Sequence, residues 1–206
     1  MKKILLLILM IYLSSNCMVY SQNRKSTTGD GKIGLSFSSF GNNDVFRVQS
    51  LCGDASYDGD YFYTIGINYF YIINRWLELE SGLEFSKHRI VATPPFSGIE
   101  NGILMPIKAN TSLLSIPLVM RANFWKYFFI NGGLVLEFDT SSESLIDNQS
   151  GIGAQFGVGL KYDINRLFSL YINPYTRIHS LVPFADRKYH QRIWENGVKV
   201  GITYAL

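Results

Sequence analysis

The chain has 206 residues, enough for one domain, and its formal net charge is only +3. So small an excess excludes proteins that bind nucleic acid through a strongly basic surface. Aromatic residues make up 15% of the chain, glycine is frequent, and no helical period of any length follows the N-terminal segment. This composition is typical of a β-sheet protein and excludes an all-helical one.

The first 21 residues have the pattern of a secretory signal peptide. Lys2 and Lys3 precede the apolar run "ILLLILMIYL", and small residues precede a cleavage site that we place after Ser21. One alternative is a membrane anchor, for which the apolar run is short. The other is a lipoprotein signal at Cys17, where "SSNC" has asparagine before the cysteine in place of a small residue.

Cleavage after Ser21 would remove two lysines and no acidic residue, so the net charge would fall from +3 to +1. Cys52 would then be the last cysteine, and a single cysteine cannot form an internal disulfide. The polar residues 22–31, "QNRKSTTGDG", predict a flexible leader, which leaves 32–206 for one folded domain.

The rest of the chain alternates between apolar and polar residues, the pattern of β-strands with two different faces. In "VKVGITYAL" (198–206), for example, every second residue from Val198 to Leu206 is apolar. The predicted strands cover 32–40, 61–73, 76–87, 112–124, 127–138, 151–163, 167–178 and 194–206.

The connections between these strands alternate in length. Tight turns follow the second, fourth and sixth strands, near 74–75, 125–126 and 165–166. Long polar stretches follow the other strands, at 41–60, 88–111, 139–150 and 179–193. The alternation predicts a meander of eight antiparallel strands with all its long loops at one end.

Strands of about 9–13 residues can cross a bilayer when tilted, and an even-numbered meander can close and so remove its edges. A soluble lipocalin-like barrel shows the same alternation with the apolar face inward. We favour the membrane barrel because the polar faces hold small residues suited to a narrow lumen rather than a lysine- and glutamate-rich coat. The predicted fold is all-β, an eight-stranded antiparallel up-and-down transmembrane β-barrel, surrounded by the lipid of the cell outer membrane.

If the apolar faces meet lipid, nine charged residues of nearly balanced sign face the lumen. Buried charges must be paired, and strand order favours two pairs, Glu78 with Arg121 and Arg177 with Glu195. We therefore predict a polar plug that sets strand register, with no open pore, catalytic group, cofactor or metal. The nine residues are Glu78, Glu80, Glu84, Arg121, Glu137, Lys161, Arg177, Glu195 and Lys199.

Other candidate sites are weaker. His88, His179 and His190 are far apart and show no metal-ligand spacing. An enzyme that hydrolyses lipid would need a Ser–His couple, but His179 and Ser180 are adjacent on a strand and should point to opposite faces.

The long loops are the predicted binding regions. The acidic run in 41–60, with Asp54, Asp58 and Asp60, lacks the full pattern of a calcium loop. Loop 88–111 is apolar for a loop, so it either binds a protein partner or folds over the barrel mouth.

Two stretches are more specific than the alternation. "LELESGLEFSK" (77–87) and "SLLSIPLVMRANFWKYFFINGGLVLEF" (112–138) resemble the outer-membrane β-barrel family common in Bacteroidetes, the PorT-like group. The matching positions are Leu77, Leu79, Gly82, Leu83, Phe85, Ser86 and Lys87, then Ile116-Pro117-Leu118, Gly132-Gly133 and the terminal "VGITY". The resemblance implies a cell-envelope location and no enzymatic activity, and some members of the family take part in protein secretion.

We therefore expect a non-enzymatic outer-membrane barrel with a structural or surface-interaction role, its partners reached through loops 41–60 and 88–111. One alternative is a barrel that binds or transports small ligands or lipids. Another is an outer-membrane lipid hydrolase. Nucleic acid is not an expected partner.

Overall fold

The computed structural model describes residues 31–47, 56–93, 106–141, 145–184 and 191–206. The predicted signal peptide and nearly all of the leader lie outside these residues. Among the residues described, no helix is both long and apolar enough to cross a membrane. Eight strands are present: β1 (Gly31–Arg47), β2 (Ser56–Ile72), β3 (Leu77–Thr93), β4 (Ile107–Phe124), β5 (Phe128–Asp139), β6 (Gly151–Asp163), β7 (Phe168–Pro183) and β8 (Gln191–Ala205).

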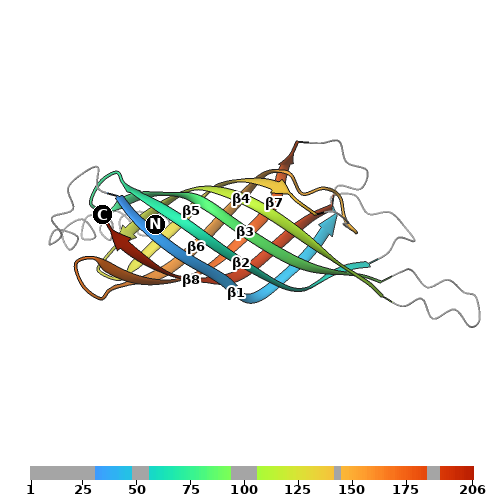
Figure 1. The fold of residues 1–206 in the computed structure, drawn as a ribbon, viewed down its shortest axis with the longest axis horizontal. Helices are drawn as coiled ribbons and strands as arrows, with labels where there is room; N and C mark the ends of the chain where they lie inside the picture. The colour runs from blue at the N-terminus through green and yellow to red at the C-terminus, as the bar shows by residue number, and fades with distance from the viewer. Residues whose placement is uncertain (1–30, 48–55, 94–105, 142–144, 185–190) are drawn as a thin grey trace, which may run out of the picture.

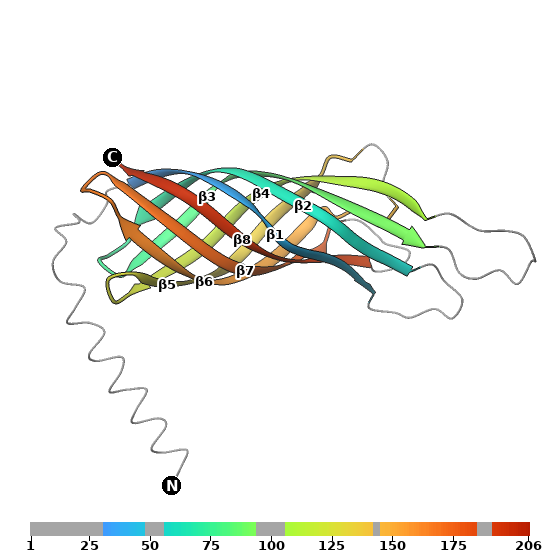
Figure 2. The same cartoon turned by 90° about the horizontal axis from the view of Figure 1, so that it is seen from below.

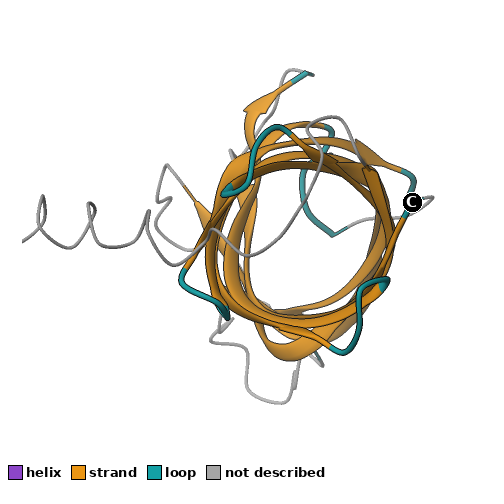
Figure 3. Cartoon of the chain, turned by 90° about the vertical axis from the view of Figure 1, so that its left-hand side faces the viewer, coloured by secondary structure: helices purple, strands orange, loops and turns teal. Residues whose placement is uncertain are grey.

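The strands form one closed antiparallel barrel in sequence order (Figure 1), and Figure 3 shows the closed ring end-on. β1 and β8 close it, with Leu35 opposite Ile202. The backbone N–H of Leu206 donates to the carbonyl of Gly31 at 2.9 Å. Both ends of the barrel domain therefore lie at the end that carries the tight turns, here called the turn end; the opposite end is the loop end.

Alternation along each strand separates an apolar outer surface from a polar lumen. On β2, Ile65 and Ile67 are exposed, whereas Gly66 and Asn68 between and beside them are buried. Successive side chains of a strand point to opposite faces, so the apolar set of every strand faces outward. This barrel is the reverse of a soluble one, whose apolar residues fill the interior.

The tight turns lie where the sequence predicts them, but the strands at the loop end are longer than predicted. β1 continues to Arg47 and β2 begins at Ser56, so both enter the predicted loop 41–60. β3 and β4 likewise take both ends of 88–111, and these strands project furthest at the loop end (Figure 2). The reason is that backbone pairing continues after the apolar alternation stops, because ladder hydrogen bonds do not depend on a lipid-facing side chain.

Irregularities in the ladders also gather toward the loop end. Register shifts separate Ser39 from Asn42, Gly59 from Phe62, and Ile152 from Ala154. Such bulges bend a strand and re-aim its side chains. The shift between Ile152 and Ala154 lies opposite the part of β7 that contains His179 and Ser180.

Glycines on the inner face make room for large side chains. A Cβ on Gly159 would lie 2.2 Å from the ring of Phe129, and one on Gly201 would lie 2.4 Å from Tyr171. Gly132, by contrast, lies near the outward Phe156 and shares the outer face with Leu134. An eight-stranded interior is only wide enough for side chains, and here large rings occupy the space beside inward glycines.

Candidate functional site

The lumen is the candidate site, and the inward residues of β3 mark successive positions along its length. From the turn end to the loop end, the inward residues of β3 are Glu78, Glu80, Glu84, Ser86, His88 and Ile90, all buried. Eight of the nine predicted lumen charges are buried, each at most 5% exposed. The ninth, Lys161, is partly buried at the turn end, and its Nζ donates to Asn123 Oδ1 at 3.1 Å.

At the turn end, Lys32 Nζ lies 2.6 Å from Glu78 Oε1. Sequence reasoning missed this lysine because the predicted first strand begins with it and its apolar period starts one residue later. The buried ammonium satisfies a carboxylate that would otherwise be costly to bury.

The next layer is an aromatic cage around Arg121. Its guanidinium carbon lies 4.5, 4.3 and 4.7 Å from the ring centroids of Phe70, Phe129 and Tyr171. Arg121 Nη2 also donates to Glu80 Oε2 at 2.9 Å. A desolvated cation between aromatic faces combines cation–π attraction with a charge-assisted hydrogen bond.

The expected pairing of Arg121 with Glu78 was therefore wrong. The two residues are opposite each other in the β3–β4 register, as strand order predicts. The arginine side chain is long enough to leave its register partner, however, and it pairs with Glu80 near the rings, while Glu78 pairs with Lys32.

In the middle of the barrel, Glu84 bridges two cations. One of its oxygens accepts from Lys199 Nζ at 2.6 Å, and the other accepts from Arg177 Nη2 at 2.6 Å. Arg177 also donates to Gln155, and Asn68 donates to Glu84. These contacts join strands from opposite sides of the barrel across this layer.

The expected pair of Arg177 with Glu195 was also wrong. They face each other in the β7–β8 register, but Arg177 reaches across the lumen to Glu84. This leaves Glu195 to other groups: one oxygen accepts from the hydroxyl of Tyr175, and the other lies near two histidines.

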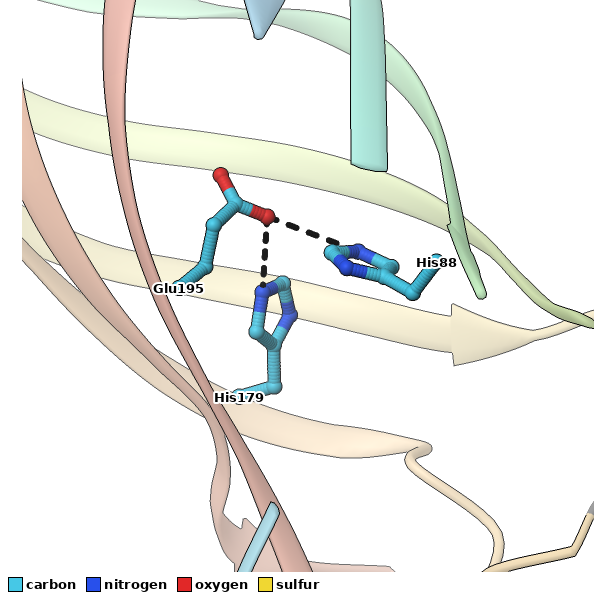
Figure 4. Close-up of side chains that lie close together, drawn as sticks. All are labelled: His88, His179 and Glu195. Carbon is cyan, nitrogen blue, oxygen red and sulfur yellow. Dashed lines mark hydrogen bonds and ion pairs between the residues drawn. The ribbon is translucent and has the colours of Figure 1, made fainter. Parts of the chain in front are cut away.

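Above Glu84 lies a cluster that the sequence did not predict, formed by His88, His179, Glu195 and Glu137 (Figure 4 shows the first three). Glu195 Oε2 lies 3.2 Å from His179 Nε2 and 3.4 Å from His88 Nε2. His179 Nδ1 lies 2.7 Å from Glu137 Oε1, an ion-pair contact too bent to count as a hydrogen bond. All four side chains are fully buried.

His179 and Ser180 do not point to opposite faces, so that expectation was wrong. Both are buried, and Ser180 has a φ of 48° beside the β6–β7 register shift. The left-handed residue breaks the alternation. The backbone N–H of Ser180 donates to Glu137 Oε2 at 2.9 Å, and its hydroxyl donates to the carbonyl of Ser150 at 3.2 Å. The hydroxyl is directed at backbone rather than at the His179 ring.

An apolar layer lies above this cluster toward the loop end. Ile90, Ile193 and Ile146 pack together, with Val45 and Tyr57 against them. Ile146 comes from the connection between β5 and β6, which is held by Gln149 and Asp147 hydrogen bonds to Gln191. This connection therefore contributes a side chain to the apolar layer at the loop end.

The remaining sequence candidates lie outside the lumen or outside the described residues. Asp58 and Asp60 are exposed on β2, where Asp60 lies 3.8 Å from Lys108. Asp54, Cys52 and His190 lie outside the described residues, as do 48–55 and 94–105 of the two predicted binding loops.

Comparisons with known proteins agree on the architecture. No protein-family model matches the chain, and no curated protein matches its sequence. The crystal structure of the outer membrane protein OprG from Pseudomonas aeruginosa matches with a TM-score of 0.52 and 15% identity, over 87% of this chain and 96% of that one. The solid-state NMR structure of the outer membrane protein AlkL in DMPC bilayers matches with a TM-score of 0.54 and 12% identity, over 90% and 93%. The predicted fold is thus confirmed: the chain is a closed eight-stranded antiparallel β-barrel of the architecture found in outer-membrane proteins.

Proposed function

We propose that this protein is a non-enzymatic outer-membrane β-barrel with a sealed lumen and a structural or surface-interaction role. The observation that carries the proposal is the sharp change from apolar to charged residues along the outer face of the strands. On β3 that face is apolar from Leu77 to Phe85 except for Ser81, and it then carries Lys87 and Arg89. On β2 the exposed residues change from Tyr61 to Asp60 and Asp58 at the corresponding height.

The thickness of the apolar band supports insertion in a bilayer. The nine-residue stretch from Leu77 to Phe85, tilted by about 40°, rises about 20 Å along the barrel axis. Outer-membrane barrels carry an apolar band of about 25 Å flanked by aromatic girdles. Here Trp76 and Trp125 at the turn end and Tyr61 and Trp194 toward the loop end are exposed in these positions.

This placement gives an orientation. The turn end, with both ends of the barrel domain, faces the periplasm, and the projecting ends of β1 to β4 stand outside the cell. Those ends support 41–60 and 88–111, which we propose as the regions that meet protein partners. The PorT-like resemblance supports a Bacteroidetes-type envelope protein, and the N-terminal pattern supports export by a signal peptide cleaved after Ser21.

The sealed lumen favours this role over transport through the barrel. Passage would have to displace the Arg121 cage, the Glu84 bridge and the isoleucine layer in turn. A lipid hydrolase is disfavoured because the Ser180 hydroxyl is buried and directed at backbone.

Location and topology are tested together. We expect the protein in the detergent-extracted outer-membrane fraction, with a folded form that migrates differently on a gel before and after heating. An epitope tag inserted within 48–55 should be labelled on intact cells, and one at 165–166 only after permeabilisation. Recovery in the soluble fraction, or labelling of the 165–166 tag on intact cells, would refute the proposal.

The sealed lumen is tested in planar bilayers. We expect no stepwise conductance from the purified barrel, with an open porin as the positive control. Steady conductance would favour the transport alternative. Release of fatty acid from phospholipid or lipid A, lost on Ser180→Ala, would favour the hydrolase.

A further inference from the structure

The loop-end cluster differs from the rest of the lumen in the source of its positive charge. Glu78, Glu80 and Glu84 each contact a lysine or arginine within 3 Å. For Glu137 and Glu195, the ion-pair contacts within the described residues are all to histidines. Two fully buried carboxylates require compensating positive charge, and a neutral imidazole supplies none.

Two of the three distances between donor atoms in this cluster match those of a metal centre. Ligand atoms of His88, His179 and Glu195 all lie within 4.8 Å of one another. Glu195 Oε2 lies 3.2 and 3.4 Å from the two Nε2 atoms. A tetrahedral ion with bonds of about 2.0–2.1 Å separates its ligands by about 3.3–3.4 Å. We propose that these three side chains form a site for a divalent transition metal of the zinc type.

The groups behind the three ligands also fit a metal site. Glu137 Oε1 lies against Nδ1 of His179, the nitrogen turned away from Glu195. The hydroxyl of Tyr175 donates to the second oxygen of Glu195. A carboxylate behind a ligating histidine and a hydrogen bond to a ligating carboxylate are the usual outer partners of a bound metal, because they fix tautomer and orientation.

His88 has weak polar contacts for a fully buried side chain. The residue is fully buried, yet its Nδ1 has no hydrogen-bond partner among the residues described. Its Nε2 contacts, to Ser86 Oγ and Glu195 Oε2, are long at 3.3 and 3.4 Å. Buried polar groups are normally well paired, and an ion at Nε2 would replace two long contacts by one short bond.

The donor set selects the class of ion. Two imidazole nitrogens and one carboxylate suit zinc, copper, nickel or cobalt, whereas calcium and magnesium prefer sites made of oxygen. With both histidines neutral, a divalent ion offsets the charges of Glu137 and Glu195. The ion would join β3 to β7 and β8 across the lumen, beneath the isoleucine layer. It would therefore bind during folding, or when that layer at the loop end separates.

The test uses the mature barrel purified in detergent, with Cys52→Ser to remove the remaining thiol ligand. The protein is unfolded and refolded with Co²⁺, and visible absorption is recorded. We expect one Co²⁺ per chain with the intense bands of a tetrahedral site, and competition by Zn²⁺. Zn²⁺ at 100 times Kd should raise Tm by about 5–10 °C.

Variants locate the site. His88→Gln, His179→Gln and Glu195→Gln should abolish the cobalt bands, and Glu137→Gln should weaken binding by about 10–100-fold. Glu78→Gln, which removes a buried carboxylate near the other end of the lumen, is the matched control and should bind as the parent does. Heat-dependent gel mobility confirms that each variant is folded.

Two results would overturn the proposal. One is the absence of tetrahedral bands and of any Zn²⁺-dependent Tm shift in the folded parent protein, which needs no variant to interpret. The other is binding that survives all three ligand substitutions, which would show that the metal binds elsewhere.

Discussion

The two halves of the lumen neutralise buried carboxylates in different ways. Toward the turn end, Glu78, Glu80 and Glu84 contact lysine and arginine side chains that are always charged. Toward the loop end, Glu137 and Glu195 contact histidines, whose charge depends on a proton or a bound ion. The first half is therefore complete when the chain folds, whereas the second half depends on what its surroundings supply.

The largest expected effect is in the aromatic cage. Arg121→Met leaves Glu80 buried without its cation and removes three ring contacts, so the free energy of unfolding should fall by about 3–5 kcal/mol. Urea unfolding in detergent micelles, followed by tryptophan fluorescence, measures this. Arg166→Gln, in an exposed turn, is the control and should change little. An unchanged midpoint for Arg121→Met would show that the turn-end half does not depend on fixed charge.

The Glu84 bridge should rank next. Glu84→Gln leaves Arg177 and Lys199 sharing one neutral acceptor, and we expect a loss of about 3 kcal/mol, since a broken buried pair leaves an uncompensated charge. Adding Lys199→Met should recover part of that loss, because it removes one of the two cations. Asp60→Asn, which touches only the exposed pair with Lys108, should cost about 0–1 kcal/mol. Equal effects for Glu84 and Asp60 would contradict the buried bridge.

Packing around the cage gives a smaller effect with a matched control. Gly159→Val places a Cβ 2.2 Å from Phe129 and 2.7 Å from the carbonyl of Ile172, so overpacking should cost about 1–3 kcal/mol. Gly132→Val meets nothing closer than 3.5 Å and should be nearly neutral. The difference between the urea unfolding midpoints of the two variants measures how tightly side chains pack in the turn-end half. Similar midpoints would mean that the Phe129 ring can move aside.

The smallest effect is expected at the mouth. Ile146→Val removes one methyl group from the layer above the histidines, so we expect a loss of about 0.5–1.5 kcal/mol in the free energy of unfolding. Hydrogen exchange at Ile193 should nevertheless accelerate, because the cover over the loop-end half is opened. Unchanged exchange would show that the connection between β5 and β6 does not gate this half.

The sequence by itself determined the fold. Alternation gave the number of strands, and the alternation of short and long connections gave the meander, because side-chain direction in a strand has a fixed period of two. The lengths of the strands at the loop end were not predictable in this way, since pairing there continues without an apolar pattern.

Only the tertiary structure decided which buried charges meet. Register places Glu78 opposite Arg121 and Arg177 opposite Glu195. Arg121 instead pairs diagonally with Glu80 on the neighbouring strand, and Arg177 crosses the lumen to Glu84. His88 and His179 are separated by most of the barrel in sequence, and closure brings them together around Glu195. A period of two specifies the face of the sheet, whereas contacts across a closed barrel depend on its curvature, on bulges and on side-chain length.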